Sequence, residues 1–201
     1  GFRSVQGKRV GIVCNQATIA SDLVHLLDHA LPRHRAGEFC VQAVFGPQHG
    51  IWGHTQDNMI EWEGYHDPVT GLLFHSLYGE HREPTDSMLN SVNHLVVDLP
   101  DIGSRYYTFA WTMALCMKAC ERQGIPVTVL DRPNPLGGSR VEGPLIDPGF
   151  ESFVGWHSVP IRHGLTLGEL ATWLRTRHYP GVELEVVQCV GWSRDQEFEE
   201  T

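Results

Sequence analysis

Short apolar runs alternate with longer amphipathic stretches along this chain. The apolar runs predict strands and lie at 10–14, 39–45, 72–77, 95–98, 127–131 and 182–190. The run at 95–98 is apolar at nearly every position, which is typical of a strand that is covered on both faces.

Between these strands, apolar residues recur at intervals of three and four, the spacing of one helix face. A first helix is expected after Ser21 as its N-cap, and another between Ser104 as its N-cap and Gly124 as its end. A short helix is expected over 85–90. The apolar positions that define the longer helices are Leu23, Leu26, Leu27, Ala30, Phe109, Met113, Cys116, Met117, Cys120, Leu167, Leu170, Ala171 and Leu174.

Strands that alternate with helices predict an α/β, Rossmann-like fold, with a mostly parallel sheet and helices on both faces. Thr166 and Glu169 form a potential capping box at the start of the last helix. Two polar segments, 46–71 and 132–163, are far longer than the usual connection of about 4–6 residues. We therefore expect these two segments to carry function or local structure of their own.

The composition excludes several classes of protein. The 201 residues include 15 Lys and Arg against 24 Asp and Glu, which gives a formal net charge of −9. A chain this acidic, with no basic run, is a poor candidate for binding nucleic acid or an anionic membrane. No apolar run approaches the roughly 20 residues that a membrane-spanning helix needs.

The five cysteines are odd in number and include no C-x-x-C motif, which favours a reducing compartment over a disulfide scaffold. Cys116 and Cys120 are expected to be buried small apolar residues rather than a metal or redox pair. With no signal peptide at Gly1, the expected location is cytoplasmic; a signal peptide removed before Gly1 is the alternative.

The sequence lacks the motifs of several cofactor sites. A dinucleotide site needs G-x-G-x-x-G after the first strand, where this chain has Cys14-Asn-Gln-Ala-Thr, and no G-x-x-x-x-G-K-[ST] occurs. The twelve histidines show no tight metal-ligand spacing, and no G-x-S-x-G elbow is present. We therefore expect neither a cofactor nor a metal.

Each predicted strand runs directly into a polar segment. Because ligands of open parallel sheets bind beyond the carboxyl ends of the strands, we expect these segments to form a site on one shared edge. The alternative is that their side chains only cap helices and turns. The polar side chains concerned are Asn15, Gln48, His49, Glu80, Asp98, Asp101, Arg105, Tyr107, Asp131, Arg132 and Asn134.

Paired carboxylates suggest a reaction for this edge. Glycoside hydrolysis needs one acid to protonate the leaving oxygen and a second group as base or nucleophile. Aromatic residues that could stack on sugar faces include Tyr78, Tyr106 and Trp156. Arg105, Arg132 or Arg162 could hold a substrate carboxylate. The candidate carboxylates are Glu80, Asp98, Asp101, Asp131 and Glu142.

A set of motifs in this order resembles the exo-β-N-acetylmuramidase family of glycoside hydrolases. The resemblance implies a Rossmann-like domain without a dinucleotide, over residues 1–190. It also implies release of N-acetylmuramic acid from the non-reducing ends of peptidoglycan fragments, in a cleft shared with a second, C-terminal domain. Residues 191–201 resemble the junction to that domain. The motifs are Cys14-Asn-Gln, Pro47-Gln-His-Gly50, Tyr78-Gly-Glu80, Asp98-x-x-Asp-x-Gly103, Leu130-Asp-Arg-Pro-Asn-Pro135, Val141-Glu-Gly-Pro144 and Arg162-His-Gly-x-Thr166.

Two positions depart from the family pattern. Muramidases of the family tend to carry Glu where this chain has Gln48, and Pro100 replaces a usual Gln. Because an amide does not titrate, Gln48 cannot act as a general acid or nucleophile. Two alternatives to an exo-muramidase therefore stay open: a non-catalytic module that binds saccharides or muropeptides, and a hydrolase of another small anionic substrate.

The resemblance and the edge segments together give a set of expected roles. Asp101 and Glu142 are the expected catalytic carboxylates, and His49 and Tyr107 are expected to assist proton transfer or charge stabilisation. The expected partners are a muropeptide or amino-sugar substrate and the C-terminal domain. The expected substrate-binding residues are Asn15, Gln48, Glu80, Asp98, Arg105, Asp131, Arg132, Asn134, Arg162 and His163.

Overall fold

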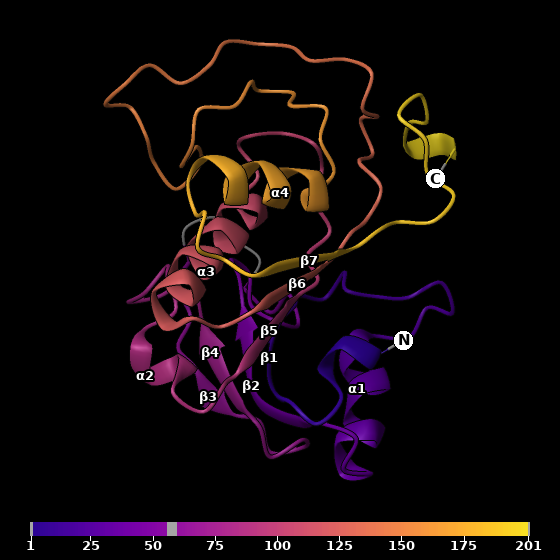
Figure 1. The fold of residues 1–201 in the computed structure, drawn as a ribbon, viewed down its shortest axis with the longest axis vertical. Helices are drawn as coiled ribbons and strands as arrows, with labels where there is room; N and C mark the ends of the chain where they lie inside the picture. Colours follow the sequence, from indigo (N-terminus) through magenta and orange to yellow (C-terminus); the bar gives the residue numbers. More distant parts are fainter. Residues whose placement is uncertain (1, 56–59, 201) are drawn as a thin grey trace.

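A computed structural model describes residues 2–55 and 60–200 of the chain. A seven-stranded sheet forms its centre, in the order β3-β4-β2-β1-β5-β6-β7 (Figure 1). All neighbouring strands pair in parallel except β3, which is antiparallel to β4. The mostly parallel α/β fold predicted from the sequence is confirmed. The strands are β1 (Arg9–Val13), β2 (Cys40–Gly46), β3 (Tyr65–His66), β4 (Leu73–Ser76), β5 (His94–Val97), β6 (Val127–Leu130) and β7 (Leu184–Val187).

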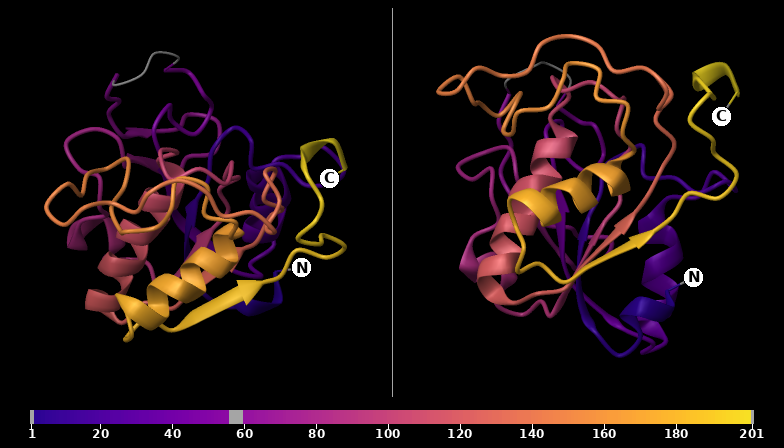
Figure 2. Two further views of the ribbon diagram at one scale, coloured as in Figure 1. Left: turned by 90° about the horizontal axis from the view of Figure 1, so that it is seen from above. Right: turned by 45° about the horizontal axis from the view of Figure 1, so that its top comes forward.

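Helices cover both faces of the sheet (Figure 2). Helix α1 (Leu26–Arg35) packs on one face, and α3 (Phe109–Gln123) with α4 (Leu167–Arg177) packs on the other. The short α2 (Asp86–Leu89) contributes Leu89 to the same core as α3 and α4. Short 3-10 helices lie near the two ends of the chain, at Arg3–Val5 and Phe198–Glu200.

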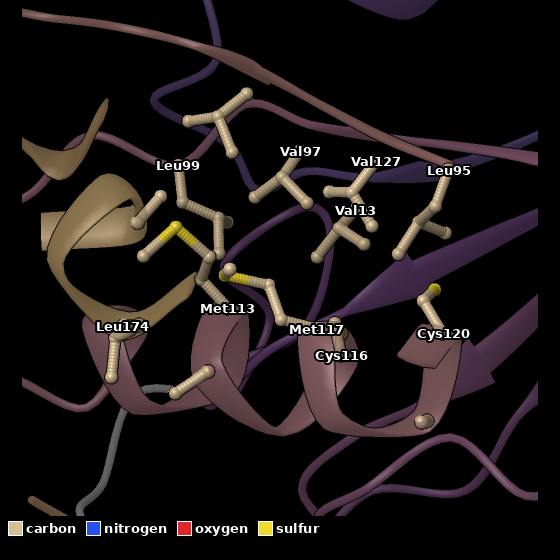
Figure 3. Packing of buried hydrophobic residues seen from close by; sticks show 14 of the residues in the cluster. Val13, Leu95, Val97, Leu99, Met113, Cys116, Met117, Cys120, Val127 and Leu174 are labelled. Atoms are coloured by element: carbon tan, nitrogen blue, oxygen red, sulfur yellow. The ribbon is translucent and has the colours of Figure 1, made fainter. Parts of the chain in front are cut away.

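Helix α3 is buried along most of its length, because strands and α4 enclose it. Cys116 and Cys120 point at the sheet among the apolar side chains of β1, β5 and β6 (Figure 3). Burial raises the pKa of Cys120 to about 12 and raises that of Cys116 as well. Both thiols therefore pack as small apolar groups, as expected.

Two predicted helix starts are wrong. Helix α1 begins at Leu26, with His25 as its N-cap, and not after Ser21. The Asp22 carboxylate instead accepts a hydrogen bond from the Val24 amide, and this turn holds Leu23 at a φ of 63°, outside any helix. Such local side-chain bonds to the backbone compete with helix formation.

The predicted cap Ser104 also lies outside its helix, because α3 begins only at Phe109. Ser104 forms an isolated bridge with Arg162, and the neighbouring Arg105 amide donates to the Ile161 carbonyl. The segment before α3 therefore pairs with the long loop 132–163 instead of joining the helix.

Two strand predictions need correction, and three helix signals are confirmed. The antiparallel β3 lies within the predicted loop 46–71, and two residues are too few to show an alternating pattern; residues 56–59 of that loop lie outside the described residues. The last strand, β7, ends at Val187 rather than at residue 190. The short helix at 85–90, the left-handed cap at Gly124 and the Thr166 capping box are present.

The long loop 132–163 is fastened to α4 through an imidazole pair. The rings of His157 and His178 stack with centroids 3.8 Å apart, and the His157 Nε2 atom lies 2.7 Å from the Tyr179 hydroxyl. Burial, with the neighbouring His178 ring, lowers the pKa of His157 to about 4, and burial lowers that of His178. The folded protein therefore favours the neutral form of both rings.

This pair predicts a loss of stability in acid. As the pH falls from about 6.5 to about 4, the unfolded chain binds a proton at residue 157 before the folded chain does, so the free energy of unfolding decreases. The contribution is on the order of 1 kcal/mol, because water screens a half-exposed ring. Urea denaturation across this range should show a shallower decrease for His157→Gln than for the wild type. The exposed His66→Asn serves as control, and equal slopes for His157→Gln and the wild type would contradict the prediction.

Candidate active site

The carboxyl ends of the parallel strands meet at one edge of the sheet, and the loop 132–163 passes over it (Figure 1). A cavity of about 580 Å³ opens there. Its volume lies within the range of about 300–1,000 Å³ that is usual for small-molecule sites. It is lined by Gln48, His49, Tyr78, Arg82, Tyr106, Tyr107, Thr108, Phe109, Ser152, Phe153 and Val154.

Two polar side chains reach the cavity from the end of β2. The Gln48 Oε1 atom accepts a hydrogen bond of 3.0 Å from the Thr108 hydroxyl. The His49 Nδ1 atom donates to the Thr55 carbonyl at 2.7 Å, because a carbonyl oxygen can only accept. In the neutral ring, the His49 Nε2 atom is then unprotonated and can accept a proton.

Aromatic rings form the walls of this cavity. Tyr107 packs edge-on against Phe109, with ring centroids 4.6 Å apart, and Tyr78 lies 5.9 Å from Phe153. Burial and the nearby Asp101 raise the pKa of Tyr107, so its hydroxyl remains protonated at neutral pH and can donate a hydrogen bond. The guanidinium of Arg82 lies 3.9 Å above the centroid of the Tyr78 ring.

Asp101 and His163 form a buried pair beside these residues. The Asp101 Oδ2 atom accepts from the Gly103 amide at 3.0 Å and lies 3.4 Å from the His163 Nε2 atom. His163 Nδ1 accepts from the Leu165 amide, so the ring proton of neutral His163 is on Nε2. Within the described part of the chain, this buried Nε2 atom makes no hydrogen bond, and its contact with Asp101 is one of proximity and charge. The Asp101 Oδ1 atom is buried and has no hydrogen-bond partner among residues 2–55 and 60–200. Such an unsatisfied buried oxygen is uncommon in folded proteins.

The tight turn after Asp101 explains the glycine of the Asp98-x-x-Asp-x-Gly103 motif. Gly103 has a φ of +76°, and a Cβ atom there would lie 2.1 Å from the Asn134 side chain. Asn134 is itself buried, donates to the Leu165 carbonyl and accepts from the Leu136 amide. A larger residue at position 103 would therefore displace the loop that carries Asp101.

The structure places the other expected carboxylates elsewhere. Glu142 is largely exposed, and its carboxylate pairs with the Arg162 guanidinium at 2.9 Å. Glu80 is 89% exposed and lies 3.8 Å from the His81 ring. Neither Asp101 nor Glu142 is among the residues that line the cavity with Gln48 and His49.

Several expected substrate-binding side chains are occupied by contacts within the domain. Asp98 holds the Arg132 guanidinium through two hydrogen bonds of 2.5 and 2.9 Å, and Arg132 also donates to the Ile19 carbonyl. Asn15 accepts from the Ala17 amide and the Thr18 hydroxyl. The Asp98–Arg132 pair lies beside a second, mainly apolar cavity of about 430 Å³, on the face of the sheet that α1 covers.

The arginines that were expected to hold a substrate carboxylate are also occupied. Arg105 donates to the carbonyls of Pro144 and Val159, both at 2.7 Å. Arg162 donates to Glu142 and to the Leu136 carbonyl. Of the expected site residues, Gln48, His49 and Tyr107 line the cavity.

Arg82 and Phe153 also line the cavity, and neither was predicted from the sequence as a site residue. Arg82 follows the Tyr78-Gly-Glu80 motif by two residues, so extending the polar segment after β4 would have included it. Phe153 lies in the long loop 132–163, where nothing in the local sequence indicates which side chains return to the sheet edge.

The fold and this cavity together define a Rossmann-like α/β domain with a cavity of small-molecule size at the carboxyl edge of its sheet. The family described as exo-β-N-acetylmuramidase NamZ, N-terminal, matches residues 10–201, and the chain belongs to that family. The resemblance deduced from the sequence motifs is confirmed.

Individual relatives agree with this assignment. The chain is 39% identical over 199 residues to the peptidoglycan β-N-acetylmuramidase NamZ of Bacillus subtilis (strain 168), covering 99% of this chain and 47% of that protein. Two solved structures of DUF1343 family proteins from Bacteroides fragilis NCTC 9343 match with TM-scores of 0.86 and 0.79, at 36% and 32% identity. The matches cover 98% and 97% of this chain and 49% and 50% of those proteins. The chain thus spans about half the length of these relatives.

Within residues 2–55 and 60–200, no group of three or more His, Cys, Asp or Glu side chains is arranged to hold a metal ion. Among the same residues, no helix is both long and apolar enough to cross a membrane.

Asp131 provides a test of which edge residues support the fold. Its carboxylate accepts from the Thr166 hydroxyl at 2.8 Å and from the Gly168 amide at 2.7 Å, at the start of α4. Asp131→Ala leaves these donors without their acceptor and should lower the free energy of unfolding by about 2 kcal/mol in urea denaturation. Asp131→Asn keeps one acceptor oxygen and should lower the free energy of unfolding by less than Asp131→Ala does.

The exposed Asp147→Ala provides the control and should change stability by less than about 0.5 kcal/mol. If Asp131→Ala is no more destabilising than Asp147→Ala, the carboxylate does not hold α4 in place.

Proposed function

We propose that the full-length protein is a glycoside hydrolase that releases terminal N-acetylmuramic acid, or a related amino sugar, from peptidoglycan fragments. The observation that carries this proposal is the cavity where Gln48, His49 and Tyr107 converge between aromatic walls. Membership of the NamZ family and the name of the Bacillus subtilis relative support the choice of substrate. In this proposal, the present chain supplies one wall of the site, and a second half of the full-length protein supplies the other; the relatives are about twice as long as this chain.

The cavity offers the contacts that an amino sugar needs. The rings of Tyr107 and Phe153 provide flat apolar surfaces on which the faces of a sugar ring pack, whereas the Arg82 guanidinium covers one face of the Tyr78 ring. The Gln48 side chain has one amide group that can pair with the 2-acetamido group of the sugar or orient a water molecule. The Thr108 hydroxyl donates to Gln48 Oε1 and so leaves the Gln48 amide nitrogen free to donate.

Proton transfer in this site falls to groups other than residue 48. In the proposed reaction, the oxygen of a water molecule bonds to the anomeric carbon and gives a proton to His49 Nε2. The glycosidic C–O bond breaks at the same time, and the leaving oxygen takes the proton of the Tyr107 hydroxyl. The proton on His49 then returns to the Tyr107 oxygen through solvent. Asp101 acts from behind Tyr107 as the buried negative charge of the site, with His163 as its partner. Glu142 has no part in this proposal because it pairs with Arg162 outside the cavity.

A non-catalytic saccharide-binding module is the second candidate. The amide of Gln48 favours it, because an amide lines the cavity at a position where a titratable group would serve hydrolysis. In that case the same cavity binds the amino sugar without cleaving it.

Hydrolysis by the full-length protein distinguishes the glycoside hydrolase from the non-catalytic binding module. Release of N-acetylmuramic acid from muropeptides or from aryl β-N-acetylmuraminides is expected for the wild type. His49→Gln should lower kcat by about 100-fold or more, because it removes the group that accepts the proton. The control is His66→Asn, which lies at the edge strand β3 and should leave kcat unchanged.

Calorimetry with N-acetylmuramic acid completes the test. Binding without turnover, with turnover gained in Gln48→Glu, would establish the binding module instead of the hydrolase. If the full-length protein neither binds nor hydrolyses these compounds, both candidates are wrong.

A further inference from the structure

We propose that Arg82 recognises the lactyl carboxylate of N-acetylmuramic acid and so selects this sugar over N-acetylglucosamine. The inference rests on the proposed function and names the residue that sets its specificity. The two sugars differ by a lactyl ether on O3, which gives muramic acid a carboxylate and leaves glucosamine neutral. Selection between them therefore requires a positive group placed beside the sugar.

The cavity contains one suitable group. Among the described residues that line it, only Arg82 carries a permanent positive charge. The arginines first expected in this role donate to Asp98, to Glu142 or to backbone carbonyls, and none of them lines the cavity. An arginine also matches a carboxylate with two parallel hydrogen bonds, which a lysine cannot do.

The surroundings of Arg82 fix its guanidinium in place. The group stacks 3.9 Å above the Tyr78 ring, and Phe153 lies on the same group at 5.6 Å. The Nη1 atom donates to the Gly79 carbonyl at 2.7 Å. Because packing already holds the planar group, little side-chain freedom is lost when a ligand binds.

Arg82 retains hydrogen-bonding capacity for a ligand. A guanidinium has five N–H groups, of which one donates to Gly79 and another donates to the Glu61 carboxylate at 3.0 Å. The Arg82 and Glu61 side chains are 31% and 59% exposed. Ion pairs at this exposure contribute little to stability, so a substrate carboxylate held between the aromatic walls can replace Glu61.

The experiment compares two substrates in each variant of the full-length protein. kcat/KM is measured for an aryl β-N-acetylmuraminide and for the matching aryl β-N-acetylglucosaminide. Arg82→Gln should lower kcat/KM for the muraminide by about 10- to 100-fold and leave that for the glucosaminide within about 2-fold. Arg82→Lys keeps the charge but loses the planar group. Its kcat/KM for the muraminide should lie between the values for Arg82→Gln and for the wild type.

Two control variants separate this role from charge and folding. Arg33 also stacks on an aromatic ring, that of Phe2 at 5.2 Å, but lies on α1 outside the cavity. Arg33→Gln should leave the substrate ratio unchanged. Glu61→Gln removes the competing carboxylate and should keep or raise the activity on the muraminide. Because the readout is a ratio within one variant, partial unfolding affects both substrates equally.

The outcomes separate this inference from the proposed function. In one outcome, the wild type hydrolyses the muraminide while Arg82→Gln lowers kcat/KM equally for both substrates, or for neither. In that case Arg82 does not select the lactyl group, and the proposed hydrolase activity is unaffected. If the wild type hydrolyses neither substrate, calorimetry with free N-acetylmuramic acid and N-acetylglucosamine tests whether Arg82 recognises the acid. An Arg82-dependent preference for the acid would then support the inference alone, and its absence would overturn it.

Discussion

The parallel hydrogen bonding of β1 with β2 and β5 is the constraint on which the rest of this domain depends. It aligns the carboxyl ends of strands that are far apart in the sequence, so that Gln48 and His49 after β2 meet Tyr107 after β5. The pairing in turn requires strands that are buried on both faces, which the cores beneath α1 and beneath α3 with α4 provide. Catalytic and binding residues on loops need such a rigid scaffold to hold their positions.

Polar residues at this edge divide into two groups by what they contact. Asp98 with Arg132, and Asp131 with Thr166, complete one another's hydrogen bonds and join loops that would otherwise separate. Among the described residues that line the cavity, His49 is bonded through its Nδ1 atom and not its Nε2 atom, and Arg82 uses two of its five N–H groups. The carboxylates expected to carry the chemistry therefore include several that mainly hold the edge together, and an arginine outside the original expectation faces the cavity.

The sequence was sufficient for the alternation of parallel strands with helices, for the end of α3 and for the start of α4, because apolar periodicity, Gly124 and the Thr166 capping box act locally. It was not sufficient where two local structures compete, as at Ser21, where the Asp22 turn prevents an early start of α1. It could not separate a capping aspartate such as Asp131 from one with an unpartnered oxygen such as Asp101, because both simply follow a strand. The approach of Phe153 depends on the path of a long loop and has no local signature.

A crystal structure of the full-length protein with bound N-acetylmuramic acid tests the central claim most directly. The account predicts the sugar in the cavity between Tyr78, Tyr107 and Phe153, with its lactyl carboxylate on the Arg82 guanidinium and its acetamido group near Gln48. A sugar bound instead in the cavity beside Asp98 and Arg132, or with its carboxylate turned away from Arg82, would contradict it.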